Sequence, residues 1–186
     1  MTRNIKQELI NMLIEMVDKQ DLNTISVKDL TKRCGITRQA FYYHFSGIYD
    51  LLGYFYKTES DYILSQHNKE SIQEGFIDVM YWGLKYRNIV ISTYNSAQRD
   101  SVENFMYRVI NPYIIDIVKE YSKGMNVSEE QCEFIAKFYT LTINAIYLNW
   151  VKSGMQEKPE VLVHNASLLM AGSFKRALLN FEKANN

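Results

Sequence analysis

Cysteine and proline are both scarce in this sequence, with two of each among 186 residues. Cys34 and Cys132 lie far apart, and neither belongs to a Cys-x-x-Cys pair or has a histidine pair nearby. This pattern excludes a disulfide-rich scaffold and predicts no zinc site. We expect both thiols to be free and reduced, as in the cytoplasm. So few prolines, together with only eight glycines, argue against a turn-rich β fold and predict an all-α protein.

Long apolar runs and a net charge are also absent. No stretch is apolar enough for a secretory signal or a membrane span, so we expect a cytoplasmic protein that does not enter the membrane. The 21 Lys and Arg residues balance 21 Asp and Glu residues, which excludes a surface that attracts nucleic acid everywhere. A surface that binds nucleic acid must therefore be local.

Motifs for catalysis and cofactor binding are missing too. The segment Gly47–Gly53 is not a phosphate loop, because Tyr54 and Phe55 follow it where Lys and Ser or Thr are required. There is no Gly-x-Ser-x-Gly motif and no paired-carboxylate signature. The three histidines are isolated, and none lies at a helical spacing from another His or a Cys that would suit a metal: His44, His67 and His164. We therefore expect no enzyme activity, no cofactor and no metal site.

The stretch Ser26–Phe45 predicts two short helices joined by a tight turn. Ser26 lies three residues before Asp29, so its hydroxyl can cap the first helix. Gly35 can take the left-handed conformation that ends this helix, and Thr37 can cap the second. The apolar positions fall on one face of each helix: Val27, Leu30 and Cys34 on the first, and Ala40, Phe41 and Phe45 on the second. This is a helix-turn-helix pattern.

Hydrogen-bonding side chains gather on the outer face of this pattern. Arg38 and Gln39 can pair with base edges, whereas the hydroxyls of Thr37 and Tyr42 can reach phosphates. Residues 24–46 contain four cations and one acid, a formal balance of +3 in a neutral chain. A purely structural three-helix bundle is the alternative, but it leaves this polar face without a purpose. The predicted DNA-contacting residues are Ser26, Thr37, Arg38, Gln39, Tyr42, Tyr43 and His44.

At these residues the sequence resembles the TetR family of bacterial transcriptional regulators. The resemblance covers about the first third of the chain and rests on Gly35-Ile36-Thr37 and Phe41-Tyr42-Tyr43-His44-Phe45. It implies a DNA-reading N-terminal domain, a connecting helix that moves this domain, and a C-terminal domain that binds a ligand and dimerises. Where the family usually has a phosphate-contacting Lys, this sequence has Ser46 and Gly47. We expect that backbone contact to be weakened or replaced.

Capping residues and helical periodicity predict that the other elements are helices as well, with expected caps at Asn4, Ser71 and Ser128. Residues 1–46 would form the three-helix DNA-binding domain, completed by the start of the connecting helix 47–66, and residues 67–186 the larger C-terminal domain. The expected helices outside the motif cover residues 5–19, 47–66, 71–87, 88–94, 102–121 with a kink at Pro112, 128–153 and 159–183.

The C-terminal region is rich in aromatic residues, which make good ligand pockets because their rings carry polar tips. An ordinary aromatic core is the alternative for any one of them. The predicted effector-binding residues are Trp82, Tyr86, Phe105, Tyr107 and Tyr139.

The resemblance also implies a homodimer through the last two helices. Small residues in the last helix would let partner helices approach closely, although they could instead pack within one subunit: Ala166, Ser167, Ala171, Gly172 and Ser173. We therefore expect a dimeric repressor that binds a palindromic operator in double-stranded DNA and is released by an unknown small molecule. The alternative is a DNA-binding dimer whose C-terminal domain docks a protein partner and has no small-molecule effector.

Overall fold

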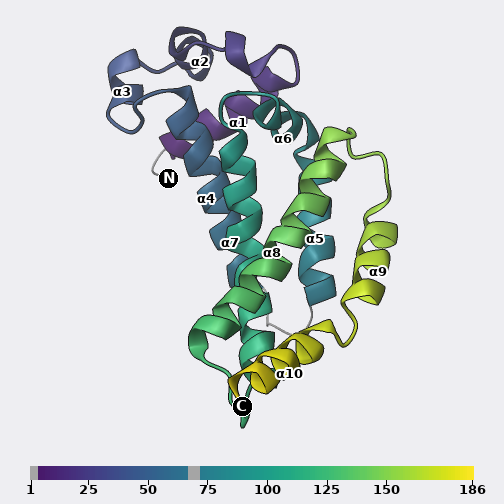
Figure 1. Ribbon diagram of the computed structural model, residues 1–186. Coiled ribbons are helices and arrows are strands. Elements are labelled where there is room, and N and C mark those ends of the chain that lie inside the picture. Colours follow the sequence, from purple (N-terminus) through teal and green to yellow (C-terminus); the bar gives the residue numbers. More distant parts are fainter. Residues whose placement is uncertain (1–3, 67–71) are drawn as a thin grey trace. The chain divides into compact units, whose positions relative to one another are not determined.

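The computed structural model describes residues 4–66 and 72–186, and these residues form helices and turns without any strand (Figure 1). The predicted all-α fold is confirmed. The helices in chain order are α1 (Ile5–Val17), the single 3₁₀ turn η1 (Leu22–Thr24), α2 (Val27–Cys34), α3 (Arg38–Tyr42), α4 (Ile48–Gln66), α5 (Ile72–Lys85), α6 (Arg87–Tyr94), α7 (Arg99–Tyr121), α8 (Glu129–Lys152), α9 (Pro159–Met170) and α10 (Ser173–Asn185). The predicted cap at Ser71 lies outside the described residues.

The chain forms two compact units. Among the described residues, unit 1 contains 4–62 and 85–105, and unit 2 contains 63–66, 72–84 and 106–186. Unit 1 therefore holds α1, α2, α3 and α6 together with most of α4 and the beginning of α7. These boundaries differ from those of the sequence-based domains, because α6 and its flanking residues pack with the N-terminal helices.

Unit 1 is built on α1, most of whose apolar residues are buried. Asn4 caps this helix as predicted, since the backbone N–H of Gln7 donates to Asn4 Oδ1 at 3.2 Å. Helix α2 packs on α1, and α3 packs on α2. The buried apolar residues of α1 are Leu9, Ile10, Leu13, Met16 and Val17.

Helix α6 is attached to the end of α1 by a polar contact. The Asn88 Nδ2 amide donates to Asp18 Oδ1 at 2.9 Å, and the two helices lie against each other. Tyr56 of α4 is buried, and this burial raises the pKa of Tyr56 well above its ordinary value, although a hydrogen bond with the Thr93 side chain partly offsets the effect. Residues from α1, α4 and α6 thus share one core.

Helix α7 contains Pro112. As expected, the helix continues beyond this proline and runs from Arg99 to Tyr121, and the kink that we expected there stays a prediction. A proline inside a helix costs about 3 kcal/mol because it removes one hydrogen bond and crowds the preceding turn. Burial of the residues around it can offset that cost at about 1.5–3 kcal/mol each: Val109, Ile110, Tyr113 and Ile114 are all buried.

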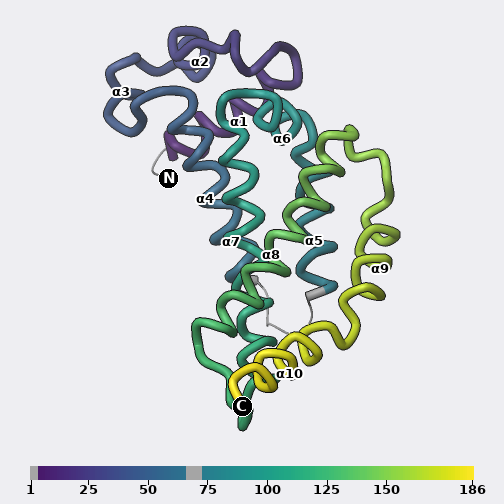
Figure 2. The backbone as a smooth tube through the Cα atoms, viewed as in Figure 1, coloured from purple at the N-terminus to yellow at the C-terminus, as the bar shows by residue number. Residues whose placement is uncertain are grey.

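The prediction of one long last helix is wrong, because the chain bends between α9 and α10 (Figure 2). Gly172 takes a left-handed conformation with φ 69°, which a residue without a Cβ adopts readily. The hydroxyl of Ser173 donates to the carbonyl oxygen of Met170 at 2.7 Å and satisfies one end group of α9. Ala171 and Gly172 are exposed at this bend, so they do not form a continuous helix face with Ala166.

Helix α8 begins as predicted. The backbone N–H of Gln131 donates to Ser128 Oγ at 3.2 Å, and the backbone N–H of Ser128 donates to Gln131 Oε1 at 2.9 Å, which completes a capping box. In unit 2 this helix approaches α5 closely at Gly83. A Cβ at that glycine would lie 2.7 Å from the hydroxyl oxygen of Tyr147, so only glycine fits without movement.

We predict that Gly83→Ala destabilises the protein by about 1–3 kcal/mol, because the added methyl overpacks the contact with Tyr147. Thermal or urea unfolding measures this loss. Gly53→Ala in α4 is the matched control, since a Cβ there meets no atom within 4 Å and should stabilise by about 0.4–1 kcal/mol. Adding Tyr147→Phe to Gly83→Ala should recover part of the loss. Wild-type stability of Gly83→Ala would contradict the packing described here.

Candidate nucleic-acid interface

The first helix of the motif is fixed at both ends by local contacts. The backbone N–H of Asp29 donates to Ser26 Oγ at 3.2 Å, and the Ser26 hydroxyl donates to Asp29 Oδ2 at 2.5 Å. Gly35 ends the helix with φ 64°, in the left-handed region that favours glycine. The Ser26 hydroxyl is therefore already engaged as donor and acceptor, and its predicted DNA contact requires the contact with Asp29 to open.

The second helix of the motif, α3, has only five residues. Thr37 caps it as expected, because the backbone N–H of Ala40 donates to Thr37 Oγ1 at 3.1 Å. Phe41 has no exposed surface and Phe45 only 4%, and their ring centroids are 5.9 Å apart. These two rings anchor residues 37–45, the recognition segment, to the core of unit 1.

The opposite side of this segment is open to solvent. Tyr43 is 85% exposed and Tyr42 is 57% exposed, whereas the core beneath them is closed. Arg38 and Gln39 are also exposed, in the first turn of α3. His44 is half-buried with its ring edge-on to Tyr43, at a centroid distance of 4.9 Å. The structure thus places five predicted DNA-contacting residues on the exposed recognition segment: Thr37, Arg38, Gln39, Tyr42 and Tyr43.

The aspartates of this region accept hydrogen bonds at the beginnings of short helices. Asp21 accepts the backbone N–H of Asn23 at 2.8 Å, as Asp29 accepts the Ser26 hydroxyl. These carboxylates lie at the positive ends of short helical segments, where they stabilise the helix dipole. Both therefore have hydrogen-bond partners within the motif itself.

The cations of the motif, in contrast, are not paired with carboxylates in the described part of the chain. Lys28, Lys32, Arg33 and Arg38 are all exposed. Within the part of the chain that the structure describes, no ion pair joins any of these four to a carboxylate. Cations that are free of carboxylate partners can neutralise phosphates without first breaking an internal contact. The charge arrangement suits a polyanionic duplex.

Ser46, which stands near the position of the phosphate-contacting Lys that the resemblance led us to expect, bonds to Asp50. The backbone N–H of Ser46 donates to Asp50 Oδ2 at 2.9 Å, and the Ser46 hydroxyl donates to the same oxygen at 3.2 Å. Asp50 lies in the first turn of α4, where a carboxylate compensates the helix dipole. The start of α4 therefore carries an anion and two engaged donors in place of a free ammonium group.

The predicted effector residues fall in both units. Tyr86 and Phe105 belong to unit 1, where Tyr86 packs 5.2 Å from Phe55 and Phe105 packs 5.7 Å from Tyr56, measured between ring centroids. Both rings therefore contribute to the core of unit 1, and their ligand role stays a prediction.

The other three predicted effector residues belong to unit 2. Trp82 is buried in α5. Tyr139 of α8 packs against Phe174 at a centroid distance of 4.5 Å. Tyr107 lines a groove of about 410 Å³ between α7 and α8, and its hydroxyl oxygen accepts the Asn111 Nδ2 amide at 3.4 Å. Sequence periodicity placed these residues on helices but could not determine which ones share a cavity.

Metal and membrane sites are not evident in the described part of the chain. No group of three or more His, Cys, Asp and Glu residues is arranged there to hold a metal ion. None of the helices described above is both long and apolar enough to cross a membrane.

The fold and the recognition segment together define a helix-turn-helix DNA-binding protein. Residues 13–54 match the family described as bacterial regulatory proteins, tetR family, and residues 70–172 match the family described as transcriptional regulator C-terminal region. The second match covers more than half of the chain. The chain belongs to the TetR family of DNA-binding transcriptional regulators, as the motif predicted.

Solved structures of similar fold include three regulators. The dihydroxyacetone kinase operon activator DhaS is 16% identical with a TM-score of 0.73, over 92% of this chain and 96% of that chain. A tetR-family transcriptional regulator from Streptomyces coelicolor is 14% identical with a TM-score of 0.60, over 97% and 87%. The fatty acid degradation regulator FadR from Bacillus halodurans is 16% identical with a TM-score of 0.62, over 92% and 97%.

At these identities the likeness shows a shared fold. No curated protein gives a sequence match to this chain.

We predict that Gln39→Ala weakens binding to the operator by about 1–3 kcal/mol and leaves binding to scrambled DNA nearly unchanged, because we expect Gln39 to read a base edge. Tyr42→Phe removes the hydroxyl that we expect to contact a phosphate and should weaken binding to both duplexes by a similar factor. Fluorescence anisotropy at a stated salt concentration measures both variants on an operator selected from random sequences. An equal loss on both duplexes for Gln39→Ala would contradict its assignment as a base-reading residue.

Proposed function

We propose that the protein is a dimeric repressor that binds an inverted-repeat operator and is released when a small molecule binds unit 2. Recognition helices related by a twofold axis read half-sites related by the same axis, so a dimer implies a palindromic operator. The predicted DNA-contacting residues from Ser26 to His44 supply one half of that reading surface. The observation that carries the proposal of a dimer is an exposed apolar surface on the C-terminal helices.

This apolar surface lies on α8, α9 and α10. Phe134 is 63% exposed, Phe138 59% and Leu169 82%. Exposed apolar residues that gather on a few helices often mark protein interfaces. The large exposed apolar residues of these three helices are Phe134, Phe138, Leu141, Val161, Leu168, Leu169 and Leu179. Their location supports the homodimer that was predicted through the C-terminal helices.

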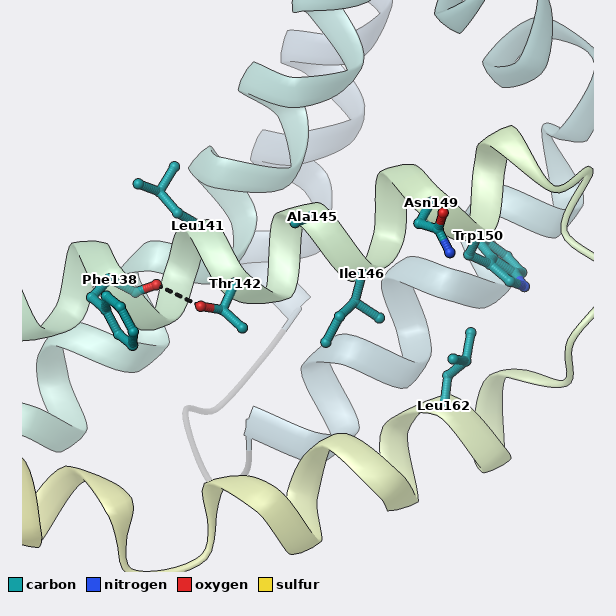
Figure 3. Close-up of a pocket in the computed structure, with 8 residues that line it drawn as sticks. All are labelled: Phe138, Leu141, Thr142, Ala145, Ile146, Asn149, Trp150 and Leu162. Carbon is teal, nitrogen blue, oxygen red and sulfur yellow. Dashed lines mark hydrogen bonds between the residues drawn. The ribbon is translucent and has the colours of Figure 1, made fainter.

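A groove of about 680 Å³ accompanies this surface (Figure 3). Ile146 and Trp150 of α8 face Leu162 of α9 across it. Its polar groups are few, and the Thr142 hydroxyl is already engaged because it donates to the carbonyl oxygen of Phe138 at 3.0 Å. An apolar groove of this size beside exposed rings suits the side chains of a partner helix.

Unit 2 also offers room for a small molecule. One groove of about 410 Å³ is the one lined by Tyr107 and Asn111. Another, of about 510 Å³, is lined by Ile117, Phe174 and Lys175 among others. Both volumes fall within the range that ligand pockets occupy. They give a small-molecule effector room within unit 2.

We predict that Phe138→Glu converts the dimer into monomers at micromolar concentration, because it places a charge in an apolar interface. Sedimentation velocity measures the change. Tyr62→Glu is the matched control: Tyr62 is 61% exposed but lies on α4, and its variant should remain dimeric. A dimer that persists in Phe138→Glu at unchanged affinity would place the interface elsewhere.

We predict that a panel of small metabolites contains a compound that raises the melting temperature, because a ligand of the native state stabilises it by mass action. Tyr107→Ala and Lys175→Ala test the two grooves separately, since only the variant in the true site should lose the shift. The same compound should release operator DNA and restore transcription from the operator promoter. Transcription that falls when the compound is added would contradict a repressor, and a panel without any shift would favour the partner-docking alternative.

A further inference from the structure

Lys6 lies beside the point where the recognition segment joins α4. Its Nζ atom is 5.9 Å from the centroid of the Phe45 ring and 4.9 Å from that of the Tyr54 ring. Phe45 is the last residue of the aromatic run, and Tyr54 lies in α4. The two rings also pack on each other, with centroids 5.4 Å apart. A residue from the first turn of α1 is therefore placed at the edge of the DNA-binding surface.

The aromatic rings hold the Lys6 ammonium group in position without neutralising it. Cation–π attraction fixes the group over the ring faces but leaves its full positive charge. Within residues 4–66 and 72–186, no carboxylate forms an ion pair with Lys6. Lys119, in contrast, pairs with Glu129 at 2.8 Å. Lys6 is half-buried, so its stem is covered while part of the side chain stays accessible.

The neighbouring start of α4 cannot supply this charge. Ser46 gives both its backbone N–H and its hydroxyl to Asp50, which leaves a carboxylate at the beginning of the helix. A phosphate group approaching this end of the recognition segment would meet that anion unless a cation lies close by. Lys6 is a cation that the fold holds against Phe45, the residue that precedes Ser46.

We propose that Lys6 contacts a DNA phosphate at the junction of α3 and α4. The ammonium group donates to a backbone oxygen on the strand that flanks the bases read by α3, and the Phe45 and Tyr54 rings position it for this contact. Lys6 thereby provides the positive charge that Ser46 and Gly47 do not provide. The contact is independent of sequence, because every nucleotide presents the same phosphate. It depends on DNA binding and not on the proposed effector or dimer surface.

The test compares Lys6→Met, which keeps an unbranched stem of similar length and removes the charge, with Lys6→Arg, which keeps the charge. Lys19→Met is the matched control, because Lys19 is an exposed cation beyond the opposite end of α1. Each variant is titrated with the selected operator and with a scrambled duplex over a range of salt concentrations. The melting temperature of each free protein is recorded alongside.

We expect Lys6→Met to lower affinity by the same factor on both duplexes and to reduce the salt slope by about 1. The ratio of the wild-type affinity to the Lys6→Met affinity should then fall by about threefold between 50 and 200 mM salt. Lys6→Arg and Lys19→Met should keep the wild-type slope.

Three results would overturn the assignment. An unchanged slope with a lower melting temperature would make Lys6 a packing residue only. A loss confined to the operator would make it a base reader. Equal effects of Lys6→Met and Lys19→Met would show that only the net charge of the protein matters and not the position of Lys6.

Discussion

The DNA-reading surface depends on the burial of Phe41. Helix α3 has five residues, far fewer than the roughly 12–15 that an isolated helix needs for even marginal stability in water. Burial of one Phe side chain contributes about 1.5–3 kcal/mol, and the Thr37 cap adds about 1 kcal/mol. The helix therefore exists because its inner side is part of the core of unit 1. The packing of Phe41 in that core sets the orientation of Arg38 and Gln39. A substitution beneath α3 should therefore alter DNA binding even when every predicted DNA-contacting residue is unchanged.

In the same region, acidic and basic side chains have different roles. Aspartates satisfy backbone or hydroxyl donors within a few residues of themselves, as Asp29 and Asp50 do. Lysines and arginines remain without carboxylate partners throughout the described part of the motif. A chain with no net charge can therefore present a locally positive surface to a duplex. Counting residues alone gives the balance of +3, but only the structure shows that the single acid of residues 24–46, Asp29, accepts a hydrogen bond from Ser26 and is not paired with one of the cations.

Sequence patterns predicted the local features well and the distant ones poorly. The caps at Ser26, Thr37 and Ser128 were predicted and are present, because each depends on a partner three residues away. The continuation of α7 past Pro112 was also predicted, whereas the burial of the residues around this proline depends on tertiary contacts that periodicity along one helix does not report. The bend at Gly172 could have been predicted, because a glycine can end a helix. We instead interpreted Gly172 as one of the small residues of a dimer interface within one long helix. The grouping of the effector residues is entirely a matter of tertiary contacts.

The division into two units limits how a signal can reach the DNA-reading helices. The chain passes between the units after Tyr62, after Leu84 and after Phe105. The first and last passages lie inside the continuous helices α4 and α7, whose hydrogen bonds resist local bending. The middle passage lies next to Tyr86, the one residue between α5 and α6. Since Asn88 binds Asp18 at the end of α1, a displacement of α5 by the proposed effector would act on α6 and, through this contact, on the helix that supports the whole recognition motif.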